Sequence, residues 1–159
     1  MNDKNTQTLY RDFPMLYRDA SKSLSETCMS RGFCCGDGWF PLVYQLSAQI
    51  EVEALRLGLN PRTDEWPCAD QVKEKFGTLR FYVSMPASEK GQHAFEQFGQ
   101  MMSIRPVVGI ASIQTLISQA EEKSGTICEH CGAPGSLRQG GWWRTLCDAC
   151  EAKYQKDAL

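Results

Sequence analysis

Two Cys-X-X-Cys pairs near the C-terminal end of this 159-residue chain constrain its fold more than any other feature. The first pair is Cys128 and Cys131, the second is Cys147 and Cys150, and 15 residues lie between them. This spacing is typical of zinc sites, in which each pair presents two sulfurs and two pairs complete a tetrahedral shell. A disulfide framework would need an oxidising compartment, and residues 1–13 have no apolar segment of a secretory signal. The pattern therefore predicts a Zn²⁺ ion bound by these four thiolates.

The residues around the two pairs predict a small module at positions 125–159. Residues 132–135 close the first cysteine turn, residues 136–146 fit a strand, a glycine turn and a second strand, and Asp148 can begin a helix. A cysteine turn, a hairpin and a helix in this order resemble a treble-clef zinc finger. Four protein ligands leave no open position, so the ion is expected to be structural rather than catalytic. His130, inside the first pair, is the alternative ligand to one of the thiolates.

Four further cysteines form no Cys-X-X-Cys pair. Because adjacent cysteines point in different directions and seldom share one ion, we interpret all four as core or loop residues. The alternative is a second metal site. Free cysteines commonly behave as small buried hydrophobic residues. These four are Cys28, Cys34, Cys35 and Cys68.

The charge balance argues against a general duplex-DNA binder. Lys and Arg number 17, Asp and Glu number 19, and four thiolates around one Zn²⁺ would take the formal charge from −2 to about −4. Proteins that bind duplex DNA depend on a basic stripe or domain, which this chain lacks. The longest apolar stretch, residues 107–117, is interrupted by polar residues and is shorter than the roughly 20 residues of a membrane span. We therefore expect a protein of the cytoplasm without a membrane partner.

The first 124 residues predict a helical body that contains one β-hairpin. Helices are expected at 6–13, 88–104 and 106–123, and a long amphipathic helix follows Gly36-Asp37-Gly38 and ends at Gly58. We interpret Asp37 as the N-cap of the long helix and Trp39 as the anchor of its first turn; the alternative is a tight glycine loop that presents the carboxylate. The expected fold class is α+β: a helical body (1–124) with a hairpin at 71–84 and a treble-clef-like zinc module packed on it.

The hairpin pattern separates an apolar face from a charged one. Gly77-Thr78 fits a type II′ turn, which would place Phe76 opposite Leu79 and Lys75 opposite Arg80. The apolar face would then carry Val72, Phe76, Leu79, Phe81 and Val83, and the other Lys73, Lys75, Arg80 and Tyr82.

Two groups of side chains are candidates for ligand binding. Like charges directly opposite each other cost about 0.2–1 kcal/mol, so Lys75 and Arg80 suggest a bound anion, with Tyr82 beside them for a base or phosphate. The alternative is a solvated face whose charges pair with acidic neighbours such as Asp70. The second group contains Trp142 and Trp143, which would point to opposite faces of a strand. One of them would then pack on the body and the other would be exposed; the alternative is that both pack. The candidate ligand-binding residues are Lys73, Lys75, Arg80, Tyr82, Trp142, Trp143 and Arg144.

Signatures of catalysis are lacking in the sequence. Neither a glycine-rich phosphate loop nor H-E-x-x-H occurs, and no Ser/His/Asp or Cys/His arrangement can be argued. We therefore expect a protein that binds rather than catalyses.

Three blocks carry a resemblance to a known family. They are GDGWF at 36–40, QVKEKFGTLRFYV at 71–83, and CEHCGAPG followed by GWWRTLCDAC within 128–150. In this order they resemble a small family of zinc-finger proteins encoded by tailed phages and prophages. The resemblance implies an accessory phage product in the bacterial host cytoplasm. Proteins of this class often act against host defence, by binding a host factor or sequestering a phosphate-bearing ligand.

The leading hypothesis is therefore a non-enzymatic zinc protein that binds a host protein or a phosphate-bearing ligand. The first alternative is a nucleic-acid-binding zinc finger that uses the same face. The second, weaker alternative is an enzyme that acts on nucleotides.

Overall fold

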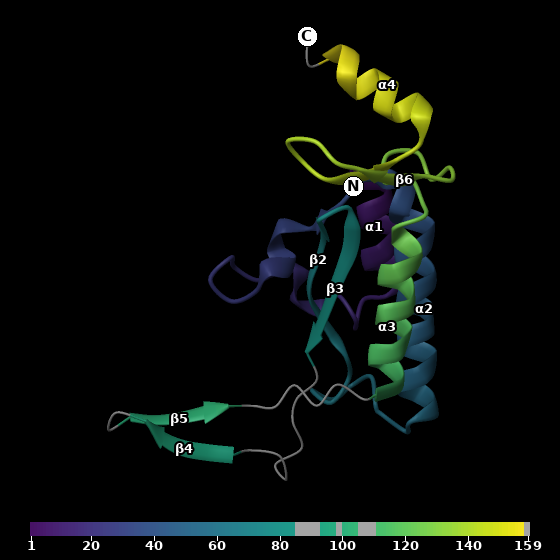
Figure 1. The fold of residues 1–159 in the computed structure, drawn as a ribbon. Helices are drawn as coiled ribbons and strands as arrows, with labels where there is room; N and C mark the ends of the chain where they lie inside the picture. The colour runs from purple at the N-terminus through teal and green to yellow at the C-terminus, as the bar shows by residue number, and fades with distance from the viewer. Residues whose placement is uncertain (85–92, 98–99, 105–110, 158–159) are drawn as a thin grey trace.

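A computed structural model describes the chain except residues 85–92, 98–99, 105–110 and 158–159. It confirms a mixed α+β fold (Figure 1). The described helices and strands follow in the order α1 (Asp3–Asp12), β1 (Phe33–Cys34), α2 (Phe40–Arg56), β2 (Cys68–Lys75), β3 (Thr78–Ser84), β4 (His93–Gln97), β5 (Gln100–Ile104), α3 (Ala111–Ser124), β6 (Ser136–Arg138), β7 (Arg144–Leu146) and α4 (Asp148–Asp157). Three short 3₁₀ helices cover Arg18–Ser21, Cys28–Arg31 and Asp37–Trp39.

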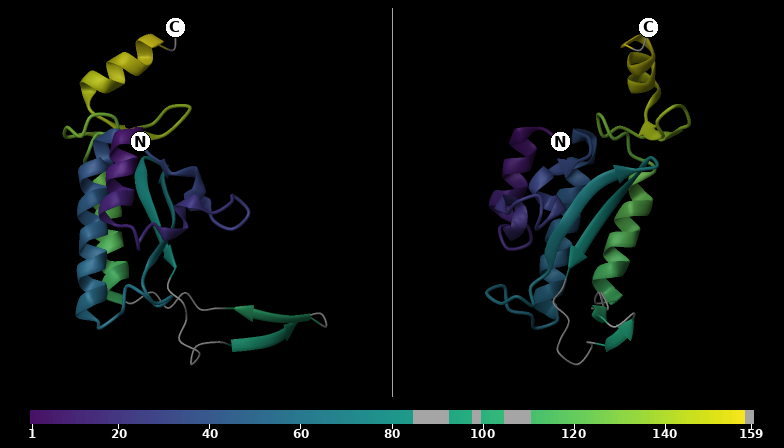
Figure 2. Two further views of the ribbon diagram at one scale, coloured as in Figure 1. Left: turned by 180° about the vertical axis from the view of Figure 1, so that it is seen from behind. Right: turned by 90° about the vertical axis from the view of Figure 1, so that its left-hand side faces the viewer.

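The centre of the body is a three-stranded sheet in the order β1-β2-β3. Strand β2 runs antiparallel to β3 and parallel to the short β1. Helices α2 and α3 contact each other, and α3 also contacts β3, beside which it lies in the right-hand view of Figure 2. The open edge of β3 is protected by α3, because the N–H of Leu79 donates to Ser124 Oγ at 2.8 Å and that of Phe81 to Glu121 Oε1 at 3.1 Å. An edge covered in this way cannot pair with another chain.

One apolar core joins the N-terminal segment, α2, the hairpin and α3. It is built where the helical and strand periodicities direct apolar residues to one side. Trp39, at the start of α2, is fully buried, as the sequence predicts for an anchor of the first helical turn. The largest fully buried side chains of this core include Trp39, Leu9, Leu16, Met29, Leu46, Ile50, Leu79 and Ile113.

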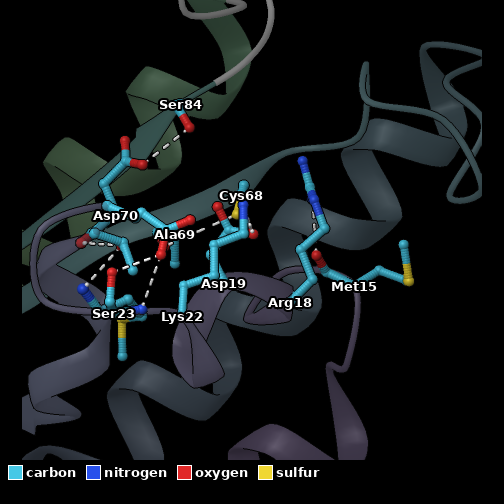
Figure 3. A network of polar contacts seen from close by, with 12 residues as sticks. Met15, Arg18, Asp19, Lys22, Ser23, Cys68, Ala69, Asp70 and Ser84 are labelled. Atoms are coloured by element: carbon cyan, nitrogen blue, oxygen red, sulfur yellow. Dashed lines mark hydrogen bonds and ion pairs between the residues drawn. The ribbon is translucent and has the colours of Figure 1, made fainter.

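The segment between α1 and β1 is fixed to the start of β2 by polar contacts (Figure 3). The Arg18 guanidinium donates to the carbonyls of Met15, Trp66 and Pro67 at 2.8–2.9 Å. Asp70 accepts from Ser84 Oγ at 3.0 Å across the hairpin. This carboxylate therefore serves the fold of the hairpin base, rather than pairing with the lysines of the charged face.

The observed hairpin register corrects the predicted one. The turn is formed by Phe76 and Gly77, with φ of 56° and 78°, and not by Gly77 and Thr78. Positive φ at both central residues is the requirement of a type I′ turn, which matches the twist of the strands. The shift places Arg80 opposite Lys73 instead of Lys75. It also turns Phe76 out of the core, since 64% of this side chain is exposed, whereas the other four residues of the predicted apolar face are buried.

The predicted helices are confirmed in α1 and α2, and the helix predicted at 88–104 is wrong. Residues 93–97 and 100–104 form the antiparallel strands β4 and β5, not a helix over 88–104; positions 88–92 and 98–99 lie outside the described residues. Helical periodicity is a weak signal where strand pairing supplies the backbone hydrogen bonds. The last predicted helix is present as α3, and its expected start at 106–110 also lies outside the described residues.

Asp37 is not the N-cap of α2. Its Oδ1 accepts from the N–H of Asn2 at 2.8 Å and from Asn5 Nδ2 at 3.0 Å, so it fastens α1 to the body. Helix α2 starts without a side-chain cap, and Pro41 in its first turn removes one N–H that would otherwise need a partner. No described helix combines the length and the apolar character needed to cross a lipid bilayer.

Candidate metal centre and neighbouring surfaces

The four cysteines of the two pairs converge on one point. The Sγ atoms of Cys128, Cys131, Cys147 and Cys150 all lie within 4.8 Å of one another, and those of Cys131 and Cys147 are 3.6 Å apart. Sulfurs that bind one zinc tetrahedrally at 2.3 Å are about 3.8 Å apart, so this spacing fits Zn²⁺. The predicted cysteine cluster is therefore confirmed as a group able to hold a metal ion. Within the described part of the chain it is the one such group.

Local backbone structure positions these thiols. The N–H of Cys128 donates to Ala133 O at 2.7 Å and that of Gly132 to Cys128 O at 2.8 Å, which closes the first cysteine turn. Strands β6 and β7 form the predicted antiparallel pair, but β7 begins at Arg144, so Trp142 and Trp143 precede it. Both rings are exposed, and the prediction that at least one of them packs on the body is wrong. Cys147 directly precedes α4, and Cys150 lies in its first turn. The predicted order of cysteine turn, hairpin and helix is therefore present, with two cysteines in the turn and two at the start of the helix.

The thiols of this cluster influence one another's ionisation. Burial opposes ionisation of Cys128, but N–H groups of Cys147, Cys131 and His130 outweigh it and lower the pKa of this thiol to about 7. Burial and the neighbouring thiols instead raise the pKa of Cys150 to about 12. Four thiolates at this spacing repel one another unless a dication lies between them. The chemistry of the donor set is therefore that of a soft divalent metal.

The remaining cysteines and His130 stay outside the cluster. Cys28 and Cys34 are exposed, while Cys35 and Cys68 are buried. Burial raises the pKa of Cys35 to about 12 and that of Cys68 to about 11, so both are neutral thiols near pH 7. This agrees with their interpretation as core and loop residues. The His130 ring packs edge-on against Tyr154 at a centroid distance of 5.9 Å.

The first cysteine turn is docked on the start of α2. The N–H of Gly38 donates to Glu129 O at 2.8 Å, and that of Gly36 to Glu129 Oε1 at 2.9 Å. Trp39 Nε1 donates to Ile127 O at 2.8 Å. Burial raises the pKa of Glu129, which the Gly36 N–H partly offsets. The Gly-Asp-Gly-Trp segment at 36–39 therefore binds the cysteine turn. The sequence analysis, which predicted a helix cap here, did not find this role.

The hairpin turn of the body is docked on β7. Thr145, which is fully buried, donates through Oγ1 to Gly77 O at 2.6 Å. Glu74 accepts from the N–H of Gly77 at 2.7 Å through one oxygen and from Trp142 Nε1 at 2.9 Å through the other. A Cβ at Gly77 would lie 2.3 Å from Leu137 Cδ1, and the φ of 78° also favours glycine at this position. These contacts fix the indole ring of Trp142 relative to the hairpin.

A groove of about 770 Å³ lies beside this second contact, and we call it the aromatic groove. Three of its rings are strongly exposed: 64% of Phe76, 67% of Trp142 and 45% of Trp143. The rings of Phe76 and Trp143 meet nearly edge to face, with centroids 6.2 Å apart. Two lysines border the rings, and one ammonium lies 5.2 Å from the Phe76 centroid. The groove is lined by Lys73, Glu74, Lys75, Phe76, Gly141, Trp142 and Trp143.

The structure brings together four of the seven residues predicted to bind a ligand. Lys73, Lys75, Trp142 and Trp143 line the aromatic groove, which also takes in Phe76, a residue that the sequence assigned to the core. No local signal points to the exposure of Phe76, because type I′ turns favour Asn, Asp or Gly at this position.

The other three predicted residues lie elsewhere. The Arg80 guanidinium donates to Thr78 Oγ1 at 2.6 Å and lies 4.0 Å from Glu121, so a carboxylate of α3 offsets its charge opposite Lys73. Tyr82 is 44% exposed, and the Lys73 ammonium lies 5.5 Å from the centre of its ring. Arg144 stacks on Tyr154 and faces a different cleft.

Comparisons with protein-family models, curated proteins and solved structures find no match for this chain. The similarity to a phage family noted above therefore stays a prediction, and function is inferred from the residues themselves.

Proposed function

We propose that this chain is a non-enzymatic, zinc-stabilised protein that binds a partner protein through the aromatic groove. The observation that carries the proposal is the exposure of three large rings, Phe76, Trp142 and Trp143, at one place. Contiguous exposed apolar surface is typical of interaction sites, and tryptophan is the residue most enriched among the energetically dominant contacts of interfaces. Because the bond from Trp142 to Glu74 orients its ring in advance, less side-chain entropy is lost on binding.

The proposed role of zinc is structural. The cysteine turn, the hairpin β6–β7 and α4 support its assignment as a treble-clef-like finger, because they supply two ligands from the turn and two from the start of the helix. The buried cluster of this module consists of little more than the cysteines and Leu146. An interior of this size is too small to fold without a staple. The metal would thereby hold Trp142 and Trp143 in the groove.

We propose a partner with an acidic segment that carries an apolar side chain. Lys73 and Lys75 border the groove, and the carboxylate of Glu74 is already engaged by Gly77 and Trp142. A formal net charge of −2 favours a protein over a nucleic acid, since phosphate neutralisation needs a larger excess of basic residues. In keeping with the similarity to phage proteins, the proposed partner is a host protein of the bacterial cytoplasm, with a counter-defence role.

The test compares the zinc-loaded full chain with two double variants in capture from a bacterial lysate. Phe76→Ser/Trp143→Ser removes two rings of the groove. Val52→Ser/Leu55→Ser is the control, because it removes two residues of α2 that are exposed to a similar extent. We expect the wild type and the control to retain the same proteins and the groove variant to lose them. Equal retention by the groove variant would refute the proposal.

The same capture separates the proposed function from nucleic-acid binding. A protein interface built on aromatic anchors should survive nuclease treatment. Loss of the captured material on nuclease treatment would instead show that the groove binds nucleic acid, whereas a loss with salt alone is also expected for lysine contacts to an acidic protein.

A further inference from the structure

A second cleft, of about 390 Å³, lies at the seam between the body and the cysteine module. We call it the seam cleft. It shares Glu74 and Trp142 with the aromatic groove, but most of its wall is separate. A volume of this order is within the range of sites for small molecules, roughly 300–1,000 Å³. Its lining includes the side chains of Glu74, Glu129, His130, Trp142, Arg144 and Tyr154.

Arg144 gives the seam cleft an anion-binding group. Its guanidinium is half-buried, with its carbon 4.8 Å from the centroid of Tyr154. Among the residues that the structure describes, it makes no ion pair and donates no side-chain hydrogen bond. A stacked guanidinium with unused donors is suited to bidentate binding of a phosphate or carboxylate. His130 lies on the same Tyr154 ring and adds a second nitrogen donor to this wall.

The lining of the seam cleft also offers an acceptor and a ring. Glu129 uses Oε1 for the Gly36 N–H at 2.9 Å, while Oε2 takes no hydrogen bond from any described residue. Glu74 uses both oxygens within the fold, so Glu129 is the carboxylate left to accept from a ligand. Trp142 borders the cleft with an indole that is 67% exposed and held by its own N–H. An exposed ring fixed in orientation is a platform for stacking a flat heterocycle.

We propose that the seam cleft binds a nucleoside phosphate whose base is guanine. The phosphate would pair with Arg144 and His130, the base would stack on Trp142, and its N–H edge would donate to Glu129 Oε2. Guanine is favoured because its ring N–H and its amino group are adjacent donors, which Glu129 can accept at the free Oε2 and at the second lone pair of Oε1. Adenine presents a ring nitrogen acceptor at that edge, which would face the carboxylate and repel it. The site lies beyond the aromatic groove and adds a small-molecule ligand to the protein.

The test is isothermal titration of the zinc-loaded full chain with GMP, AMP, guanosine and inorganic phosphate. We expect saturable binding of GMP, with AMP and guanosine weaker by about 10- to 100-fold, as expected for loss of hydrogen bonds to a charged group. Arg144→Ala should weaken GMP binding by a similar factor while retaining one zinc per chain and the wild-type melting temperature. Glu129→Gln should reduce the preference for GMP over AMP, since an amide accepts and donates at that edge.

Trp143→Ser is the matched control, because this residue lines the aromatic groove and not the seam cleft. It should leave GMP binding unchanged, while Arg144→Ala should leave the capture of partner proteins unchanged. Failure of the seam cleft is therefore distinguishable from failure of the proposed function. The inference is overturned if GMP does not saturate, if phosphate alone binds as tightly as GMP, or if Arg144→Ala with its zinc retained binds GMP like the wild type.

Discussion

The N–H of Gly38 donates to the carbonyl oxygen of Glu129 at 2.8 Å, across 91 residues of sequence, and so joins the start of α2 to the first cysteine turn. The approach is close enough that a Cβ at Gly38 would lie 2.2 Å from Cys128 O and 2.4 Å from Gly132 N. Both are backbone atoms, which cannot move aside as the end of a flexible side chain can. Glycine is therefore required at position 38 because the cysteine turn leaves no room for a side chain, and not because the backbone there has a positive φ.

Gly38→Ala should destabilise the protein by about 1–3 kcal/mol, the cost typical of an added methyl group in a well-packed site. Denaturant unfolding monitored by circular dichroism measures the change. Gly140→Ala is the control, because a Cβ at Gly140 meets nothing within 4 Å. Wild-type stability of Gly38→Ala would contradict the docked arrangement.

Removal of the metal should unfold the cysteine module and leave the body folded. The body has its own core of buried residues, whereas the module's buried cluster rests on Cys128, Cys150 and Leu146. Chelation should therefore abolish the helical signal of α4 alone, and elemental analysis should find one zinc per chain before treatment. Cys150→Ser should lose the metal and Cys34→Ser, at an exposed site, should keep it. Full unfolding on chelation would show that the body depends on the module.

Thr145→Val should cost about 1–3 kcal/mol, because it leaves the buried Gly77 carbonyl without its 2.6 Å partner. Valine keeps the shape of threonine, so the loss reports the hydrogen bond and not a cavity. Thr115→Val, at an exposed position of α3, should change the free energy of unfolding by less than about 0.5 kcal/mol. Thermal or chemical unfolding of the two variants makes the comparison, and an equal effect at both positions would argue against a special role for Thr145.

Phe76→Asn should raise the free energy of unfolding by about 0.5–1 kcal/mol while it weakens partner binding. At a φ of 56° the phenylalanine is in the left-handed region, which asparagine tolerates better and which bulky residues seldom adopt. The gain in stability would show that the strain is retained for the sake of the exposed ring. Phe76→Leu, which keeps the strain, should bring no such gain. A loss of stability with Asn would mean that the ring supports the fold.

The thiols of Cys35 and Cys68 should resist alkylation well above neutral pH. Burial raises their pKa to about 12 and about 11, and the reactive species is the thiolate. In native protein at pH 8, iodoacetamide and mass spectrometry should find Cys28 and Cys34 labelled first, because both are exposed. Labelling of Cys35 at the rate of Cys34 would contradict the assigned core.

The same thiols predict the pH dependence of stability in the alkaline range. Their folded pKa exceeds the unfolded value of about 8.5, so the unfolded chain ionises first as pH rises. The free energy of unfolding should therefore be constant below about pH 8 with respect to these groups and fall as pH rises through 9 towards 12. A double variant, Cys35→Ala/Cys68→Ala, should show a smaller decline between pH 9 and 11 in denaturant unfolding. An unchanged slope would assign the alkaline decline to other groups.

Features that depend on short stretches of sequence could be predicted. The cysteine cluster follows from ligand spacing, the long helix from its apolar period, and the buried positions of β2 and β3 from strand alternation. The register of the hairpin could not, because local preference favours Gly77-Thr78, whereas the observed turn places Phe76 at a positive φ that bulky residues seldom adopt. In the observed turn Gly77 lies against Leu137 and Thr145, which are 60 and 68 positions further along the chain.

The sequence by itself determined that four thiolates meet and that a hairpin and a long helix exist, since spacing and periodicity act over a few residues. Only the tertiary structure decided what lies next to the cysteine module. It assigned Gly38 to backbone docking, exposed Phe76 beside two tryptophans, and placed Arg144 and Glu129 in the lining of one cleft. The physical reason is that both surfaces are formed by close packing between distant segments, and no local preference of the chain encodes that packing.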